Sequence, residues 1–269
     1  MRLIRTKVSL VLAVGIVIAI TWDQGITLRL TGGAFLIVFL VSSIALTAVA
    51  REKNYEETWF GSRAIAELTK AETWSFIMKL KPYDTRPEKE AENRFLDRLR
   101  EVLKAQQNIS SELAPHLHEG TQITPIMEQI RIEPFSKRKE FYIQNRIRDQ
   151  MIWYSRKAEW NKIQVSRWLN ITWILEILAV AFALIVTLAP NTEINPVGIV
   201  LAASAGVLCW LNSKSYNEAA QSYGLVSSEL SILKERAERA STVDELSETV
   251  LDTENLINQE HRVWLGRVI

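Results

Sequence analysis

The sequence predicts an all-α membrane protein: two transmembrane helical hairpins, four spans in total, that continue into a cytoplasmic helical bundle. Three observations support this fold class. Four almost uncharged apolar blocks of about 15–21 residues occupy positions 8–22, 31–50, 169–189 and 196–211. A long, highly charged stretch, residues 51–167, separates the second block from the third. No segment shows the alternation of apolar and polar residues that is typical of a half-buried strand.

The length of the apolar blocks is close to that of a membrane span. A helix needs about 20 residues to cross a hydrocarbon core of about 30 Å. Within lipid every backbone polar group must be satisfied internally, so spans of this kind have to be helical. The net charge of +1 and the 23% of charged residues are averages over apolar spans and strongly charged segments. A net charge this close to zero gives no support for nucleic-acid binding.

The first block follows Arg2, Arg5 and Lys7 and therefore resembles the start of a secretory signal. The stretch after it offers no small-x-small cleavage site, and a second apolar block begins within ten residues. We expect a first span that is retained in the membrane.

Lys and Arg residues near the block ends predict the orientation. If the blocks form two hairpins, most of these residues lie on one side, whereas the other side holds Arg29 in its first turn and none in residues 191–195. By the positive-inside rule, both termini and residues 51–167 are cytoplasmic. We therefore expect a multi-pass protein of the cell inner membrane.

The polar segments are helical in character. The spacing of Phe95, Leu96, Leu99, Val102 and Leu103 predicts a helix with one buried face, after a break at two prolines. Prolines and a glycine predict an irregular stretch between residues 114 and 135. A long helix is expected to begin near residue 139 and to run into the third span. A last helix is expected over residues 243–266, with Ser241 as its cap.

The stretches after the two hairpins resemble each other. The first hairpin is followed by Lys53, Tyr55 and Glu57, and the second by Lys214, Tyr216 and Glu218 at the same spacing. This indicates two related modules of a hairpin with a cytoplasmic helix. The predicted division is residues 1–80 for the first module, 81–138 for a cytoplasmic linker region, and 139–269 for the second module.

Two polar and aromatic stripes are candidate clamps between helices. One has spacings of 4, 4, 3 and 4 and lies just before the third block, and the other, which includes Lys70, has the same spacing just after the second block. Such spacing places each set on one helical face. The nine candidates are Tyr142, Arg146, Gln150, Trp153, Lys157, Trp59, Arg63, Glu67 and Trp74. A ligand pocket or a gating lever is the alternative use of these faces.

Glu176 is a carboxylate inside the third apolar block. A charged group at mid-membrane is costly, so it is usually functional or paired. We expect Glu176, with Thr172 and Asn170, to line a pore or take part in gating. The alternative is that Glu176 is a hydrogen-bonded partner of Asn170, Thr172, Ser204 or Asn212.

Known catalytic and metal-binding motifs are absent from the sequence. His116 and His118 flank one leucine, but no further clustered ligand accompanies them. Glu254 and His261 on the last predicted helix fit a solvated or clamp role better than acid–base chemistry. We therefore expect no enzyme activity, no cofactor and no bound metal.

The sequence also resembles the SLATT superfamily of bacterial two-transmembrane effector domains. The resemblance rests on the stripe from Tyr142 to Lys157, on Tyr216 to Leu230, and on Asp252 to Trp264. The first hairpin, with Trp59, Arg63, Glu67 and Trp74, is similar to another branch of the same superfamily. The resemblance implies a tandem pair of such modules over nearly the whole chain.

The resemblance implies an oligomeric membrane effector of a bacterial stress or defence system. Such an effector would form a pore or channel and be gated from its cytoplasmic helices. The expected partners are the lipid bilayer, further copies of the chain, and a nucleotide-sensing or other cytoplasmic sensor protein, but no nucleic acid. The alternative is a non-conducting membrane-anchored scaffold or sensor that binds a cytoplasmic partner through the faces at residues 95–103 or 243–264.

Overall fold

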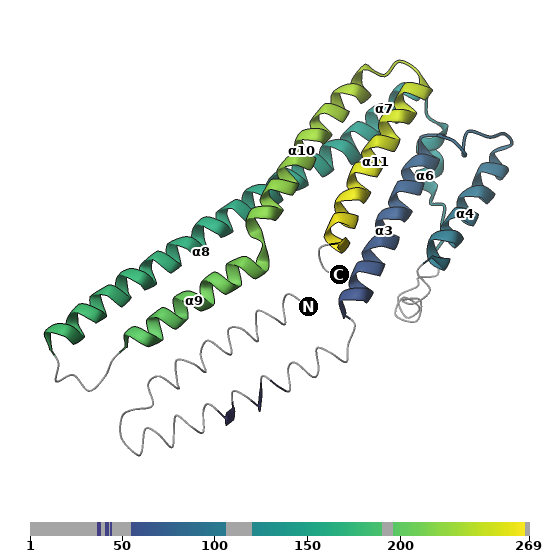
Figure 1. Cartoon of the computed structure of the whole chain (residues 1–269). Coiled ribbons are helices and arrows are strands. Elements are labelled where there is room, and N and C mark those ends of the chain that lie inside the picture. Colours follow the sequence, from purple (N-terminus) through teal and green to yellow (C-terminus); the bar gives the residue numbers. More distant parts are fainter. Residues whose placement is uncertain are drawn as a thin grey trace. The chain divides into compact units, whose positions relative to one another are not determined.

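The structure is a computed structural model that describes residues 37–38, 41–42, 44, 55–105, 120–189 and 196–266, and for residues 55–60 and 259–266 the backbone alone. All regular elements in these ranges are helices (Figure 1), so the predicted all-α class is confirmed for them. The elements are α3 (Tyr55–Ile77), α4 (Glu88–Lys104), α6 (Pro125–Ile132), α7 (Phe135–Tyr142), the π-helical turn η4 (Ile143–Arg148), α8 (Asp149–Leu188), α9 (Val197–Lys214), α10 (Tyr216–Arg239) and α11 (Val243–Gly266).

The chain divides into two compact units. The first unit comprises residues 1–54 and 158–221, and the second comprises residues 55–157 and 222–269. Helices α8 and α10 therefore each contribute residues to both units. The predicted first and second spans fall almost entirely outside the described residues.

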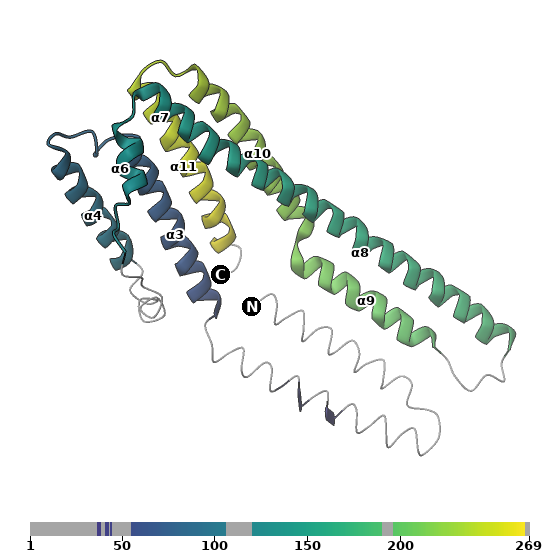
Figure 2. The ribbon, with the colours of Figure 1, turned by 180° about the vertical axis from the view of Figure 1, so that it is seen from behind.

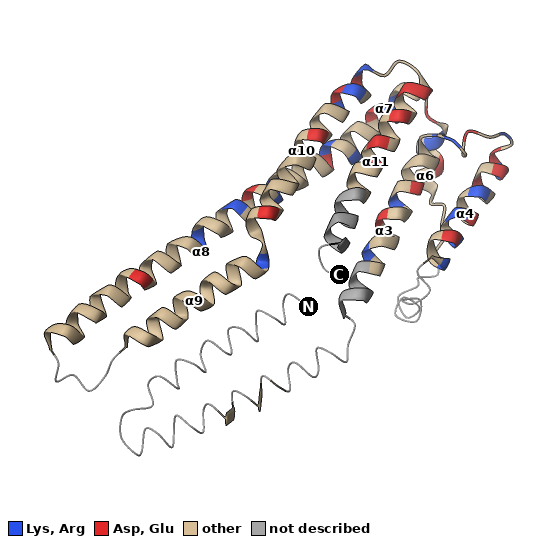
Figure 3. Ribbon diagram, in the orientation of Figure 1, with Lys and Arg blue, Asp and Glu red and all other residues tan. Residues whose placement is uncertain are grey.

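The first unit holds most of α8, all of α9 and the beginning of α10. Figure 3 shows that α9 and the C-terminal half of α8 carry few charged residues. Two helical runs, Phe135–Leu188 and Val197–Arg239, are long and apolar enough to cross a membrane. Only 11% of the most apolar window of each is buried within the protein, whereas the core helix of a soluble protein is mostly buried. These runs contain the predicted third and fourth spans.

The second unit is a helical bundle around α3. Helix α3 contacts α4, α6 and α11, and both Figure 1 and Figure 2 show it between α4 and α11. One apolar core joins these helices to α7, η4, and the parts of α8 and α10 that belong to this unit. Its largest fully buried side chains include Phe76, Tyr83, Phe95, Tyr142 and Tyr154.

The end of α3 is fixed by backbone hydrogen bonds around a left-handed residue. Lys79 has φ 57°, and its N–H donates to the carbonyl of Phe76 while the N–H of Leu80 donates to that of Ser75. This is the Schellman arrangement, which satisfies carbonyls at the end of a helix. Leu80 is 2% exposed, so the turn also directs the chain back onto the core.

Helix α4 follows the sequence prediction closely. It begins after Pro87 and buries Phe95, whose ring stacks on that of Phe76 at a centroid distance of 4.7 Å. Leu99 packs against the same core. Leu96 and Leu103 are 40% and 49% exposed, so the buried face of α4 is narrower than the predicted stripe.

The predicted irregular stretch between residues 114 and 135 is wrong in part, because α6 lies inside it. Thr124 caps this helix by accepting a hydrogen bond from the N–H of Met127 at 3.4 Å, and Pro125 occupies the first turn. Proline is favourable at that position because the N–H it lacks would have no partner there. The proline therefore starts a helix here.

Two predicted helix starts also shift. The long helix expected to begin near residue 139 begins at Phe135. In α11 the capping side chain is Thr242, which accepts from the N–H of Glu245 at 3.2 Å, and the carboxylate of Glu245 accepts from the N–H of Ser241 at 2.7 Å. The prediction of Ser241 as the cap is therefore wrong by one residue. The Thr242–Glu245 pair has the spacing of a capping box.

Candidate functional site

A buried ion pair joins η4 to α11 within the second unit. The guanidinium of Arg146 donates through Nε and Nη2 to the two carboxylate oxygens of Glu254, at 2.9 and 2.5 Å. The two residues are 4% and 5% exposed. A bidentate pair of this kind is among the strongest hydrogen-bonded arrangements available to side chains.

Tyr142 and two side chains of α3 complete the cluster. The hydroxyl of Tyr142 donates to Glu254 Oε1 at 3.2 Å, and its ring meets that of Trp74 edge-on at 5.3 Å. The carboxylate of Glu67 lies 3.9 Å from Arg146 Nη2. We call these five residues, Glu67, Trp74, Tyr142, Arg146 and Glu254, the clamp cluster.

The electrostatics of the clamp cluster favour one protonation state. Burial raises the pKa of Tyr142 well above its usual value, and the negative charge of Glu254 adds to this shift. Burial by itself lowers the pKa of Arg146, but the hydrogen bonds and charge of Glu254 outweigh it and the pKa is raised. The phenol therefore stays neutral and the guanidinium charged. The cluster acts as a polar tie between α3, α7, η4 and α11.

Of the nine predicted clamp residues, four meet in the clamp cluster: Glu67, Trp74, Tyr142 and Arg146. Trp153 is 37% exposed, and its ring contacts Tyr223 of α10 at 5.9 Å and lies 5.7 Å from Lys157 Nζ. Gln150 and Arg63 are half-buried. The side chain of Trp59 lies outside the described residues.

The π-helical turn explains why the predicted stripe leaves the buried face after Arg146. A π-turn holds more residues than an α-helical turn, so it advances the buried face along the sequence. The first buried position after η4 is Tyr154, which is 1% exposed. In an uninterrupted α-helix Trp153 would share the face of Arg146, and the residue added by the π-turn brings Tyr154 onto that face instead. Glu254, which the sequence argument left as a solvated or clamp residue, is the partner that completes the pair.

Arg131 of α6 makes a second set of buried polar contacts, and no sequence pattern singles it out. It is 2% exposed, and its Nε donates to Glu88 Oε1 at 2.6 Å. Its Nη2 donates to the carbonyl of Tyr83 at 2.6 Å, and its Nη1 donates to that of Phe76. Arg131 thus fastens α6 to the α3–α4 connection.

The three predicted pore residues lie on α8 in the first unit. Thr172 is 4% exposed and donates to the carbonyl of Trp168 at 3.0 Å, so its hydroxyl is used within the helix. Glu176 and Asn170 are exposed. Among the described residues neither Glu176 nor Asn170 has a hydrogen-bond or ion-pair partner.

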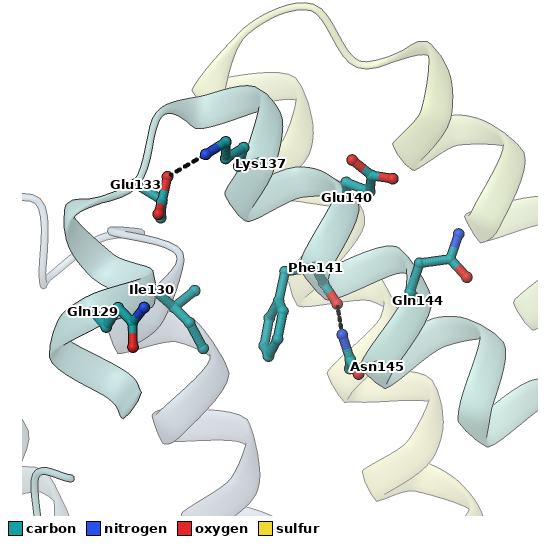
Figure 4. A pocket seen from close by; sticks show the side chains of 8 residues that line it. All are labelled: Gln129, Ile130, Glu133, Lys137, Glu140, Phe141, Gln144 and Asn145. Carbon is teal, nitrogen blue, oxygen red and sulfur yellow. Dashed lines mark hydrogen bonds and ion pairs between the residues drawn. The ribbon is translucent and has the colours of Figure 1, made fainter. Parts of the chain in front are cut away.

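An open groove of about 390 Å³ lies between α6 and α7 in the second unit (Figure 4). Ile130 and Phe141 provide its apolar part. Two of its polar members have local partners, since Lys137 pairs with Glu133 at the end of α6 at 3.2 Å and Asn145 donates to the carbonyl of Phe141 at 2.9 Å. The groove is large enough for a small ligand. None of the predicted site residues lines it.

Metal ligands are not grouped in the part of the chain that the structure describes, where no three His, Cys, Asp or Glu side chains could hold one ion. His116, His118 and the side chain of His261 lie outside this part.

Comparison with family models gives two consecutive matches. Residues 1–139 match the SMODS and SLOG-associating 2TM effector domain 3, and residues 142–264 match the SMODS and SLOG-associating 2TM effector domain 1. The predicted resemblance and its tandem arrangement are therefore confirmed. No curated protein and no solved structure matches the chain.

Proposed function

Because the chain belongs to the SLATT superfamily of two-transmembrane effector domains and carries two of them in tandem, we propose that it is a membrane effector whose copies assemble into a pore or channel. The membrane effector role follows from the family and from the apolar helices. Assembly, permeation and gating are our proposal. Four spans per chain are too few to enclose a sizeable aqueous path alone, so the path would lie between copies.

The observation that carries the proposal is the exposure of Glu176. It lies on α8 among apolar side chains that are themselves exposed, such as Trp173 and Ile177 at 69% and 63%. A charged carboxylate in contact with lipid costs about 2.5–3.5 kcal/mol on insertion scales. A ring of these carboxylates facing a water-filled path avoids the cost and favours cations.

Gating from the cytoplasmic helices is supported by helix continuity. The run Phe135–Leu188 is one helix of 54 residues that carries Tyr142 and Arg146 near its start and Glu176 near its end. A packed helix transmits a displacement along its axis. The reason is that a packed core switches between discrete arrangements and does not deform continuously. In our proposal, release of the clamp cluster opens the path.

The clamp cluster also joins the two family domains. Glu67 and Trp74 belong to the first match, whereas Tyr142, Arg146 and Glu254 belong to the second. A cytoplasmic sensor protein that binds one domain could therefore act on the other through this cluster. The proposal places the chain in the inner membrane, with four spans and both termini in the cytoplasm, and without enzyme activity.

Conductance of the purified protein in planar bilayers tests the proposal. We expect cation-selective currents from the wild type. Glu176→Gln should reduce the cation preference, because the ring of charge at the path is removed.

Glu248→Gln is the matched control, since Glu248 is an exposed carboxylate on α11 without a described partner. It should leave selectivity unchanged. Absence of current from the wild type, or equal selectivity in the wild type and Glu176→Gln, would overturn the proposed pore role.

A non-conducting scaffold is the second candidate, favoured by the apolar side chains that α4 leaves uncovered. Leu96 and Leu103 are 40% and 49% exposed on this helix of the second unit. A partner protein that co-purifies with the wild type and is lost in Leu96→Ser, with no current in bilayers, would support this function instead.

A further inference from the structure

Four cationic side chains gather where α3, α4, α6 and α7 meet in the second unit, and we call them the cationic cluster. The members are Lys79, Arg131 and Arg138, together with Arg86 of the α3–α4 connection, whose charge acts on Lys79. One carboxylate, that of Glu88, serves two of them through the same oxygen, since Glu88 Oε1 lies 2.6 Å from Arg131 Nε and 3.8 Å from Lys79 Nζ. The cluster therefore has more positive than negative charge.

Arg138 is the member whose bonding is incomplete. It is 8% exposed, and its Nη1 donates to the main-chain carbonyl of Glu133 at 3.1 Å. Its Nε is buried without a hydrogen-bond partner, and no carboxylate of the described residues lies within ion-pair distance. The hydroxyl of Thr85, two residues from the Tyr83 carbonyl that Arg131 binds, is also buried and unpartnered. A buried guanidinium without a counter-ion is costly, so this place favours an anion.

The charges of the cluster act on one another. Burial lowers the pKa of Arg138, the charge of Arg131 lowers it further, and the charge of Glu88 opposes this shift in part. Burial also lowers the pKa of Lys79; Glu88 opposes this shift, and the charges of Arg131, Arg138 and Arg86 add to it. The mutual repulsion means that an added negative charge would be stabilised here.

We propose that the cationic cluster is a binding site for a phosphate-type oxyanion. Arg131 would offer the Nε that Glu88 now occupies, Arg138 would offer its unpartnered Nε, and Lys79 and Arg86 add charge. A ligand can reach the cluster from solvent at Lys79 and Arg86, because the side chain of Lys79 is 33% exposed and Arg86 is exposed. The site does not depend on pore formation.

Glu88 acts as the internal occupant of this site. It is the first residue of α4, its side chain is 46% exposed, and it already contacts Arg131 and Lys79. A phosphate group would displace this carboxylate toward solvent and take over its contacts. Binding would then loosen the tie between Arg131 and the start of α4.

Isothermal titration calorimetry with pyrophosphate tests the site on the full chain in nanodiscs of phosphatidylcholine. We expect one site per chain. Arg138→Met should weaken binding about tenfold or more, the loss expected for one hydrogen bond to a charged group. Glu88→Gln should tighten binding, because it removes the competing charge. The matched control is Lys137→Met, since Lys137 is exposed beside Arg138 and pairs with Glu133, and it should leave binding unchanged.

Arg86→Gln provides a second variant at an exposed position, in case Arg138→Met unfolds the bundle; it should also weaken binding. Flotation with vesicles containing phosphatidic acid distinguishes a lipid headgroup from a free phosphate. Binding to these vesicles alone, lost in Arg86→Gln, would assign the site to the lipid phosphate. Binding of neither probe, or equal affinity in the wild type, Arg138→Met and Arg86→Gln, would overturn the site.

Discussion

Arg146 is held by a partner that stands 108 positions away in the sequence. Both groups are almost completely buried, so their charges compensate each other, with Glu67 as a second carboxylate 3.9 Å from Arg146. Removing one member of a buried pair leaves an unpaired charge, which costs more than the pair itself contributes. The clamp cluster should therefore be sensitive to single substitutions, although its net contribution to stability is small.

Glu254→Gln tests this at the residue scale. We expect a loss of about 3–5 kcal/mol in the free energy of unfolding, because Arg146 would stay buried without its main counter-ion. Thermal unfolding of the solubilised protein measures the effect as a lower midpoint. Glu248→Gln, a neutralisation on an exposed part of the same helix, should change stability by less than about 0.5 kcal/mol. Equal midpoints for the two variants would contradict the clamp.

At the scale of elements, the π-helical turn η4 decides which side chains of the following helix are buried. It shifts the buried face by one position, from Trp153 to Tyr154 and from Lys157 toward Ala158. Such turns are frequently found at functional sites, because they add a residue to a helix without ending it. Here the turn carries Arg146 itself.

A pair of alanine substitutions tests this register. Tyr154 is 1% exposed and Trp153 is 37% exposed. Tyr154→Ala should cost about 3–5 kcal/mol, as for other large buried aromatic residues, and Trp153→Ala distinctly less. Thermal unfolding of both variants gives the comparison. The reverse order would indicate an uninterrupted α-helix through residues 143–148.

At the scale of the whole molecule, the two family domains and the two compact units do not coincide. The second unit takes α3, α4 and α6 from the first domain and α11 from the second, so the two domains share one apolar core. Neither domain buries that core alone. In the proposed function, a sensor protein that binds either domain acts on the same clamp cluster.

Orientation in the membrane is the prediction that belongs to this scale. In a Cys209→Ser background, Thr192→Cys lies between the two apolar runs and Asp244→Cys lies at the start of α11. By the positive-inside rule, an impermeant maleimide should label Thr192→Cys in spheroplasts and Asp244→Cys only after permeabilisation. Labelling of both from the same side would refute the proposed topology.

The sequence determined the membrane-type helices, the tandem family membership and the buried side of α4, because these depend on local periodicity, composition and motifs. Tyr142, Arg146, Glu67 and Trp74 could be singled out for the same reason. The tertiary structure alone decided that Glu254 pairs with Arg146, that η4 rotates the following face, and that Arg131 and Arg138 share one charged region. Ion pairs between distant segments and a change of helical register leave no periodic trace. They are fixed by the geometry of packed helices, which brings residues together regardless of their separation along the chain.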